Sequence, residues 1–202
     1  MDETGTKAAL RRKFSTLRKA ITPEERQKYD ARICRAISDL PQFCEADTIA
    51  AFYSFGAEPD LSPLFRSKKL LLPRFVEAAG CYELAFVENI ERDLLPGKYG
   101  ILEPRPEIPA VPMDFIASRV LFLIPAVACD RRGVRIGRGG GFYDRMLSGV
   151  KIPPVAVIYS CQLSDTALPG DAHDVPVGTI VTEREVIFTE NEVMKMKQQE
   201  NE

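Results

Sequence analysis

The residues most able to do chemistry lie in one stretch, 129–145, which follows an apolar segment and contains five glycines and five arginines. Glycine lacks a Cβ atom, so several backbone N–H groups can converge on one point, and arginine adds positive charge there. A helix that begins near Phe142 would direct its positive end at the same point. The stretch predicts an anion cradle whose ligand carries phosphate. A glycine-rich surface loop with scattered arginines is the simpler alternative.

Asp144 favours the first of these interpretations. It lies three residues after Gly141, where a carboxylate could hold Mg²⁺ against a bound polyphosphate. A flexible surface loop has no need of such a residue. The hypothesis is therefore a phosphate site with a metal ligand beside it.

Two basic residues near the amino terminus, Lys7 and Arg11, are four residues apart and share one face of a helix. This face borders an apolar stripe, so the two long side chains could reach over the surface toward a site. Arg12 and Lys13 point to solvent in the same helix. Spacing alone favours a solvated basic face for Lys7 and Arg11 as well.

A second candidate carboxylate, Glu58, lies in segment 53–58, directly after the first expected strand. An α/β sheet presents ligand-binding side chains beyond the carboxyl ends of its strands, which makes Glu58 a candidate site residue. An ordinary exposed loop acid explains it equally well, and both interpretations stay open.

The single histidine, His173, is followed by Asp174. One histidine excludes a multi-histidine zinc site, and serine hydrolase chemistry is not expected without a Gly-x-Ser-x-Gly elbow. Asp174 could supply a second metal carboxylate. A His–Asp pair in a loop is more commonly a turn or capping device.

Two helices are expected ahead of the strands. Apolar residues recur at helical spacing in the first, at Leu10, Phe14, Leu17 and Ile21. Segment 22–25 then supplies an N-cap threonine, a proline at the first helical position and a capping-box glutamate for a second helix, which ends at Pro41.

Short segments that are apolar or alternating, and bounded by proline, glycine or charge, predict strands at 48–53, 69–72, 82–87, 120–127 and 155–159. The last two have the composition of strands buried on both faces, which indicates central parallel strands with helices above and below. We therefore predict a three-layer α/β/α fold with a mostly parallel central sheet. Segment 88–118 contains several prolines and little periodicity, and we expect a long ordered loop that shapes a site.

Composition predicts one globular domain, 1–188, followed by a polar tail, 189–202. A net charge of −2 provides no general basic field for nucleic acid. The five cysteines are widely spaced without a C-x-x-C pair, which predicts reduced core residues of a cytoplasmic protein. The longest apolar run, 120–129, is about half a membrane span, so we expect no membrane partner. We expect a monomer.

Taken together, these pieces resemble the 5-formyltetrahydrofolate cyclo-ligase family, also called methenyltetrahydrofolate synthetases. The diagnostic match is 135–144, where the glycine loop ends in Phe-Tyr-Asp. Individually weaker matches cover most of the chain, at 7–11, 53–58, 72–74, 99–104, 125–130, Gln162, 168–169, 173–174 and 181–183. Two departures are mild. Phe142 lacks the hydroxyl of the tyrosine common at its position, and Gly140 lacks the charge of the lysine that some members have.

The resemblance implies an enzyme that couples ATP hydrolysis to ring closure of 5-formyltetrahydrofolate, giving 5,10-methenyltetrahydrofolate, ADP and phosphate through an iminium phosphate. It implies small-molecule substrates, with ATP as co-substrate and Mg²⁺ as cofactor. The residues carried over to ATP binding are Lys7, Arg11, Arg135, Gly137, Arg138, Gly139, Gly140, Gly141, Phe142 and Tyr143. Those carried over to folate are Tyr53, Glu58, Tyr99 and Tyr143. Mg²⁺ falls to Asp144 and Asp174, and the expected catalytic residues are Arg135, Arg138 and Tyr143.

Two rival functions remain open at this stage. A non-catalytic folate-binding relative would keep the pocket aromatics without complete ATP and Mg²⁺ sites. A sugar-phosphate isomerase or a CoA-transferase-like enzyme could use the same layered fold, because a fold does not determine a function. Isomerisation needs neither nucleotide nor Mg²⁺, so a requirement for ATP separates these enzymes from a cyclo-ligase.

Overall fold

The computed structural model describes residues 6–97 and 100–190. Two helices open this part of the chain, α1 (Lys7–Lys19) and α2 (Pro23–Ser38), as predicted. The Thr22 side chain accepts a hydrogen bond from the backbone N–H of Glu25, and the Glu25 side chain accepts one from the backbone N–H of Thr22. The expected capping box is therefore confirmed. The second helix ends at Ser38, a little before the expected Pro41, and Pro41 starts a further short helix, α3 (Pro41–Glu45).

The central sheet has seven strands in the order β12-β11-β9-β6-β1-β2-β3. Five neighbouring strands are parallel, and only the strands at the two edges run antiparallel. The parallel strands are β1 (Thr48–Ala50), β2 (Lys69–Val76), β6 (Val120–Pro125), β9 (Val155–Val157) and β11 (Thr179–Val181). The edge strands are β3 (Cys81–Val87) and β12 (Val186–Phe188).

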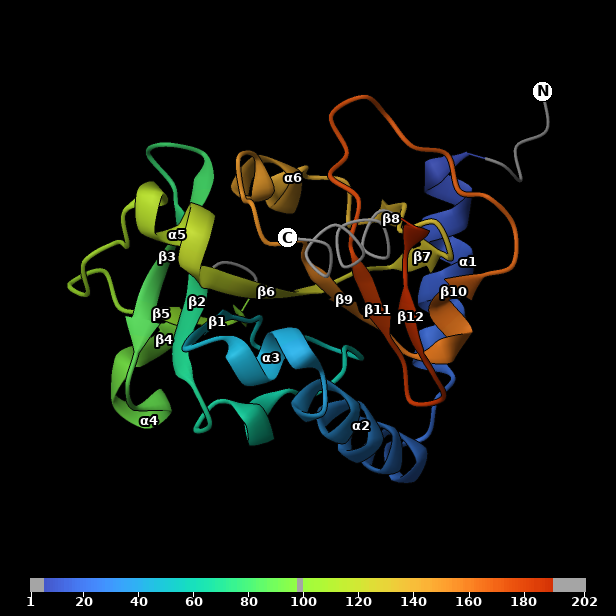
Figure 1. Cartoon of the computed structure of the whole chain (residues 1–202), viewed down its shortest axis with the longest axis horizontal. Coiled ribbons are helices and arrows are strands. Elements are labelled where there is room, and N and C mark those ends of the chain that lie inside the picture. Colours follow the sequence, from blue (N-terminus) through green and yellow to red (C-terminus); the bar gives the residue numbers. More distant parts are fainter. Residues whose placement is uncertain (1–5, 98–99, 191–202) are drawn as a thin grey trace, which may run out of the picture.

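Both faces of the sheet are buried, which confirms the three-layer fold (Figure 1). One core joins sheet residues such as Leu121 to α2 and α3. The other joins sheet residues such as Phe122 to α5 (Met113–Arg119) and α6 (Phe142–Leu147). Because successive side chains of a strand point to opposite faces, a strand covered on both sides must be apolar throughout, as β6 is.

The first helix lies outside these layers. Phe14 of α1 packs on a small second sheet that is built from β7 (Ala128–Asp130), β8 (Arg135–Ile136) and β10 (Leu163–Ser164). Figure 1 shows α1 beside these strands at one end of the molecule. The helix therefore stands next to the stretch that carries the glycine loop.

Segment 88–118 is not the long loop that we expected. In its described residues it contains α4 (Ile90–Asp93), a two-stranded sheet of β4 (Leu94–Pro96) and β5 (Leu102–Pro104), and the start of α5. Local caps hold α4, because the Asn89 side chain accepts from two backbone N–H groups of the helix. Elements this short show no periodicity, which explains the wrong prediction.

The structure bears on two further expectations, a polar tail from residue 189 and cysteines that lie in the core. Thr189 is buried and bonded to Gly178 and Val177, while residues 191–202 lie outside the described part of the chain. All five cysteines are free, but only Cys34 and Cys129 are buried, where burial raises the pKa of each thiol to about 12.

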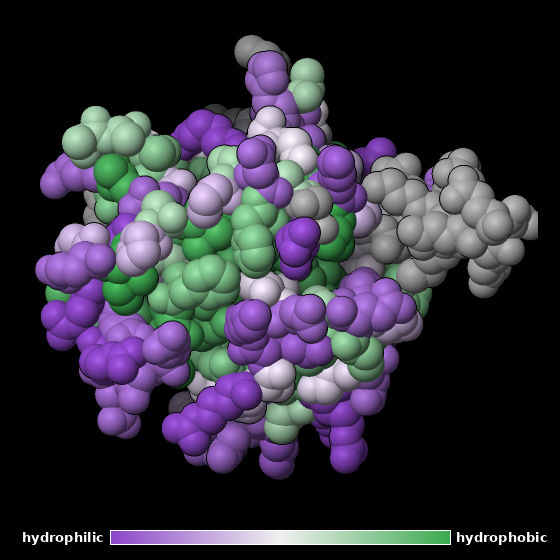
Figure 2. Space-filling view, turned by 60° about the vertical axis from the view of Figure 1, so that its left-hand side comes forward, coloured by the Kyte–Doolittle hydropathy of each residue, from purple (hydrophilic) through white to green (hydrophobic). Residues whose placement is uncertain are grey.

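One face carries apolar side chains at its surface. Figure 2 shows hydrophobic residues in the middle of this face with hydrophilic residues around them. Large exposed apolar side chains of β3, β4 and α5 are Phe86, Leu95 and Met113.

Among the described residues, no helix is both long enough and apolar enough to span a membrane.

Candidate active site

One cavity of about 730 Å³ gathers the predicted site residues. It opens beyond the carboxyl ends of β1 and β6, where Tyr53 and Pro125 lie, as expected for a parallel sheet. Every predicted site residue that the structure describes lines this cavity: Lys7, Arg11, Tyr53, Glu58, Arg135, Gly137, Arg138, Gly139, Gly140, Gly141, Phe142, Tyr143, Asp144 and Asp174. Tyr99 falls outside the described residues.

The glycine loop has the backbone that its sequence requires. Gly139 and Gly141 have φ angles of +103° and +62°, a region that residues with a side chain rarely adopt. A Cβ on Gly140 would overlap the ring of Phe142. The aromatic ring thus occupies the space of the side chain that residue 140 lacks. Helix α6 begins at Phe142 as predicted, directly after this loop.

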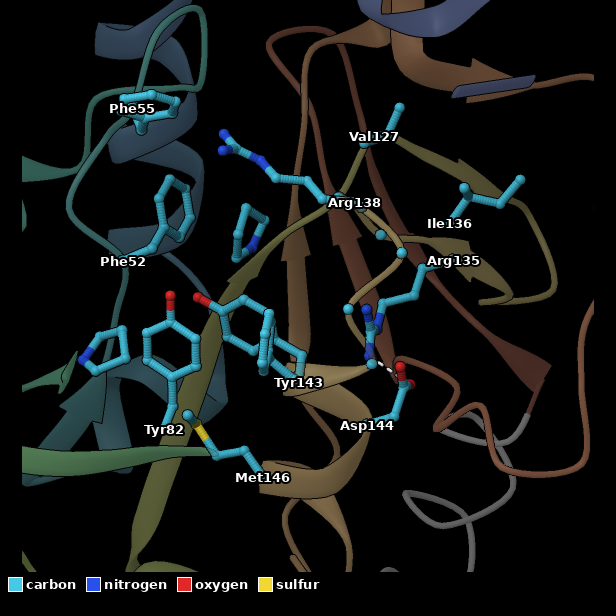
Figure 3. Close-up of a pocket in the computed structure, with 18 of the residues that line it drawn as sticks. Phe52, Phe55, Tyr82, Val127, Arg135, Ile136, Arg138, Tyr143, Asp144 and Met146 are labelled. Atoms are coloured by element: carbon cyan, nitrogen blue, oxygen red, sulfur yellow. Dashed lines mark hydrogen bonds and ion pairs between the residues drawn. The ribbon is translucent and has the colours of Figure 1, made fainter. Parts of the chain in front are cut away.

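Arg135 and Asp144, which both line the cavity, form an ion pair (Figure 3), with Nη2 and Oδ1 2.6 Å apart. The arginine side chain is only 3% exposed, and its Nε atom is buried without a hydrogen-bond partner in the described structure. The same Oδ1 also accepts a bond from the backbone N–H of Val175. A guanidinium held this firmly, with unused bonding capacity, suits an anionic ligand.

Lys7 and Arg11 turn toward the cavity, so the interpretation of a solvated basic face is wrong for them. Lys7 Nζ donates to Oδ2 of both Asp171 and Asp174, each at 2.7 Å. Arg11 Nε donates to the carbonyl oxygen of Gly137 at 2.8 Å. Helix α1 is thereby attached to the glycine loop and to the aspartate loop, and its cations border the same space.

The Lys7 contact also changes two ionisation equilibria. Burial opposes both shifts, but the bonds prevail: the pKa of Lys7 is raised by Asp171 and Asp174, and the pKa of Asp174 is lowered by Lys7 and by the backbone of Asp171. The pair is therefore ionised at neutral pH. The Asp174 side chain thus accepts from the backbone N–H of Asp171 within its own loop, as expected of a turn residue, and its charge is in addition matched by Lys7.

Glu58 is a buried site acid, 6% exposed, and not the exposed loop acid of the alternative interpretation. Its Oε1 atom accepts from Arg138 Nη2 at 2.6 Å, and Oε2 accepts from the backbone N–H of Phe55. The Arg138 guanidinium also lies 4.9 Å from the centre of the Phe55 ring. Figure 3 shows Arg138 extending from the glycine loop toward this side of the cavity.

Aromatic rings form another wall. Phe142 packs edge-on against Tyr82 and Phe75, with ring centres 4.9 and 5.9 Å apart. Tyr143 is a partly buried ring of the same cavity, and burial raises the pKa of its hydroxyl, so this group is protonated at neutral pH and can donate a hydrogen bond. Such a wall provides flat apolar surface for a fused-ring ligand.

Sequence reasoning missed several cavity residues. They are Phe52, Phe55, Tyr82, Met146 and Asp171. The sequence predicts only a strand at Tyr82, and the alternating pattern of that strand does not indicate which of its faces meets a ligand. Asp171 lies three residues before Asp174, and this spacing in a loop was the available signal. His173 is exposed and does not line the cavity.

Two carboxylates could contribute to a metal site. The bonds of Asp144 use its Oδ1 atom and those of Asp174 use its Oδ2 atom, which leaves one oxygen of each for another ligand. Within residues 6–97 and 100–190, no cluster of three or more histidine, cysteine, aspartate or glutamate side chains is placed to hold a metal. The described residues therefore offer at most part of a coordination shell.

Comparison with known proteins relates this cavity to a family. The model of the 5-formyltetrahydrofolate cyclo-ligase family matches residues 3–183. The chain belongs to this family. A 5-formyltetrahydrofolate cyclo-ligase of Escherichia coli K12 is 33% identical over 178 residues, which cover 84% of this chain and 96% of that protein. The resemblance read from the sequence is confirmed, and the chain is an enzyme of the cyclo-ligase family.

Solved structures support the same assignment. The 5,10-methenyltetrahydrofolate synthetase of Aquifex aeolicus is 35% identical, with a TM-score of 0.79 over 91% of this chain and 93% of that one. A 5,10-methenyltetrahydrofolate synthetase of Mycoplasma pneumoniae, 22% identical, has a TM-score of 0.66 over 91% of this chain and 99% of its own, and shows the shared fold. Cyclo-ligases thus share the layered architecture described above.

Proposed function

We propose that this cyclo-ligase uses ATP and Mg²⁺ to close the ring of 5-formyltetrahydrofolate, and releases 5,10-methenyltetrahydrofolate, ADP and phosphate. The observation that carries the proposal is the single cavity in which a cationic glycine loop faces a buried carboxylate and an aromatic wall. One half suits a polyphosphate and the other suits a pterin ring. Family membership supports the reaction as a whole.

The proposed reaction requires no covalent bond between the protein and the substrates. A formyl amide is a poor electrophile, so its oxygen attacks the γ-phosphorus of ATP and ADP departs, which gives an iminium phosphate. Nitrogen 10 of the folate then attacks the formyl carbon, phosphate departs and the N10 proton is lost. Because the substrate supplies both nucleophiles, the enzyme contributes positioning and charge stabilisation.

ATP is assigned to the basic half of the cavity. Lys7, Arg11, Arg135 and the loop 137–143 line this half, and four of the seven loop residues are glycines without side chains of their own. Arg135 is fixed by Asp144, so its charge needs no reorganisation when phosphate arrives. We assign Arg135 and Arg138 to stabilising the negative charge of the transferred phosphoryl group.

Mg²⁺ fits as an ion that enters with the nucleotide. Mg²⁺ commonly binds through one or two carboxylates together with substrate phosphates and water, and Asp144 and Asp174 each retain one oxygen for this. When bound, the ion neutralises phosphate charge. Asp174 would take part through its Oδ1 atom, because Lys7 and the backbone N–H of Asp171 both bond to Oδ2.

The folate is assigned to the other half. Tyr53, Tyr143 and the aromatic wall provide the apolar surface, and Glu58 is placed to accept hydrogen bonds from the amino edge of the pterin. The protonated hydroxyl of Tyr143 can donate to the formyl group or to the transferred phosphate. Tyr99 is retained for this half from the family resemblance alone.

An absorbance assay tests the proposal. Protein, 5-formyltetrahydrofolate and ATP with Mg²⁺ should produce methenyltetrahydrofolate, and omission of ATP or addition of EDTA should stop its formation. Equal turnover with EDTA would exclude the metal requirement. Folate binding without any turnover would favour the non-catalytic relative, and turnover of a sugar phosphate without nucleotide would favour the isomerase.

A further inference from the structure

One buried charge has no part in the function proposed so far. Arg18, near the end of α1, is 7% exposed, and its Nε and Nη1 atoms are buried without a hydrogen-bond partner in the described structure. It does not line the cavity. Its neighbour Leu17, which the helical spacing predicts to be part of the apolar stripe, is instead 42% exposed. The helix therefore buries a guanidinium and exposes a leucine.

Such an arrangement is costly unless a partner compensates for it. Burial lowers the pKa of Arg18, and the negative charge of Glu58 is the largest opposing influence. The atoms Arg18 Nη1 and Glu58 Oε1 are 3.8 Å apart. An isolated buried guanidinium would be strongly unfavourable, so this carboxylate is what makes the burial tolerable.

Glu58 is thus shared by two arginines of different character. The Arg138 side chain is 46% exposed and comes from the glycine loop, whereas the Arg18 side chain is 9% exposed and comes from a helix. Helix α1 packs against segment Ser160–Gln162. The half-exposed Arg138 side chain borders solvent, whereas the Arg18 side chain is enclosed by protein.

The two contacts have different consequences for ligand binding. In the structure, Arg138 occupies the Oε1 atom of Glu58 at 2.6 Å, so a pterin must displace it. The Glu58 charge also helps burial to raise the pKa of the Tyr143 hydroxyl. After Arg138 leaves, the backbone N–H of Phe55 and the more distant Arg18 are the remaining favourable neighbours described for a buried carboxylate.

We propose that Arg18 is a positioning residue that keeps the Glu58 carboxylate directed into the cavity when Arg138 turns from this carboxylate to the substrates. The inference rests on the proposed folate role of Glu58. Arg18 acts through Glu58 and does not touch the substrate. Because Arg18 is buried and does not line the cavity, a ligand that fills the cavity does not displace it.

The test compares four single variants of the full chain and one double variant, Arg18→Gln with Glu58→Gln. Arg18→Gln removes the charge at nearly constant size, and Arg18→Lys keeps the charge. Arg12→Gln is the matched control, because Arg12 is an exposed arginine of the same helix. Glu58→Gln reports on the carboxylate itself. For each we measure kcat, the KM of both substrates, and folate affinity by calorimetry, with the melting temperature as a check on folding.

For Arg18→Gln we expect folate KM and Kd to rise about tenfold, the loss of one charged contact, while kcat and the ATP KM change less than about twofold. Arg18→Lys should recover most of the affinity, and Arg12→Gln should match the unchanged protein. In a Glu58→Gln background, Arg18→Gln should cause no further loss of folate affinity. A purely structural residue would give the same loss in both backgrounds.

The outcomes separate this inference from the function on which it rests. If Glu58→Gln weakens folate binding and Arg18→Gln does not, the role of Arg18 is refuted and the proposed function stands. If Glu58→Gln leaves folate binding unchanged, the proposed role of Glu58 fails, and that of Arg18 with it. Equal losses for ATP and folate, or failure of both Arg18 variants to fold, would mark Arg18 as structural and overturn the inference.

Discussion

Replacing Asp144 by Asn separates the structural role of this residue from its proposed role toward the metal. The Oδ1 atom of Asp144 accepts bonds from both Arg135 and the backbone of Val175. Asparagine retains a carbonyl oxygen at this position, so both bonds can persist. What disappears is the negative charge opposite a guanidinium whose side chain is 3% exposed.

The magnitude follows from the difference between a charged and a neutral hydrogen bond. Bonds to charged groups contribute about 1.5–3 kcal/mol and neutral ones about 0.5–1.5 kcal/mol, so Asp144→Asn should lower the free energy of unfolding by about 1–2 kcal/mol. In a protein of this size that is about 2–8 °C in melting temperature. Asp144→Ala removes the partner altogether and should cost about 3–5 kcal/mol.

Urea unfolding at pH 7, followed by circular dichroism, measures these differences. Asp171→Asn is the matched control, because the Asp171 side chain is 71% exposed and its loss should cost less than about 1 kcal/mol. Activity is assayed separately on the folded fraction, where Asp144→Asn should lose most turnover because an amide oxygen is a weaker Mg²⁺ ligand. Equal unfolding free energies for Asp144→Asn and Asp171→Asn would refute the electrostatic reasoning.

Two further predictions concern the cavity wall and the attachment of α1. Gly140→Ala should lower the free energy of unfolding by about 1–3 kcal/mol, because the new Cβ displaces the ring of Phe142. Urea unfolding of this variant is compared with that of Gly137→Ala, where only an arginine side-chain atom lies near the new Cβ. Lys7→Met should destabilise by up to about 1 kcal/mol at pH 7. In the folded state the pKa of Asp174 is lowered and the pKa of Lys7 is raised. The contribution of the pair to stability is therefore fully present above the unfolded aspartate pKa of about 3.9 and is lost as the pH falls through the lowered aspartate pKa. It is also lost at high pH, as the pH rises through the raised lysine pKa. Urea unfolding at pH 3 and pH 7 decides this, and an undiminished difference at pH 3 would contradict it.

The sequence alone determined the parts of the fold that depend on neighbouring residues. The capping box at Thr22 and Glu25 is written in four consecutive residues, and the buried strand β6 is apolar at every position that needs to be. The glycine loop was identifiable for the same reason, because positive φ angles at Gly139 and Gly141 restrict the residue type locally.

Local pattern failed where burial is decided by a distant partner. Arg18 and Leu17 are adjacent, and the helical spacing predicts that the leucine is buried, yet the arginine is buried because Glu58 lies beside it. The short elements within 88–118 likewise depend on distant contacts, such as those of Arg74 with the backbone of Arg105 and Ile108. Their sequences contain no period to read.

The candidate site shows the same division. The sequence supplied the residue types of the cradle, but only the tertiary structure decided which charges meet. Arg138 and Glu58 are 80 residues apart, and Lys7 and Asp174 are 167 apart. Side-chain spacing within one helix cannot reveal whether a cation faces solvent or an acid from another segment. These pairings arise because the parallel strands bring their carboxyl ends to one edge of the sheet, where loops distant in sequence converge on a single cavity.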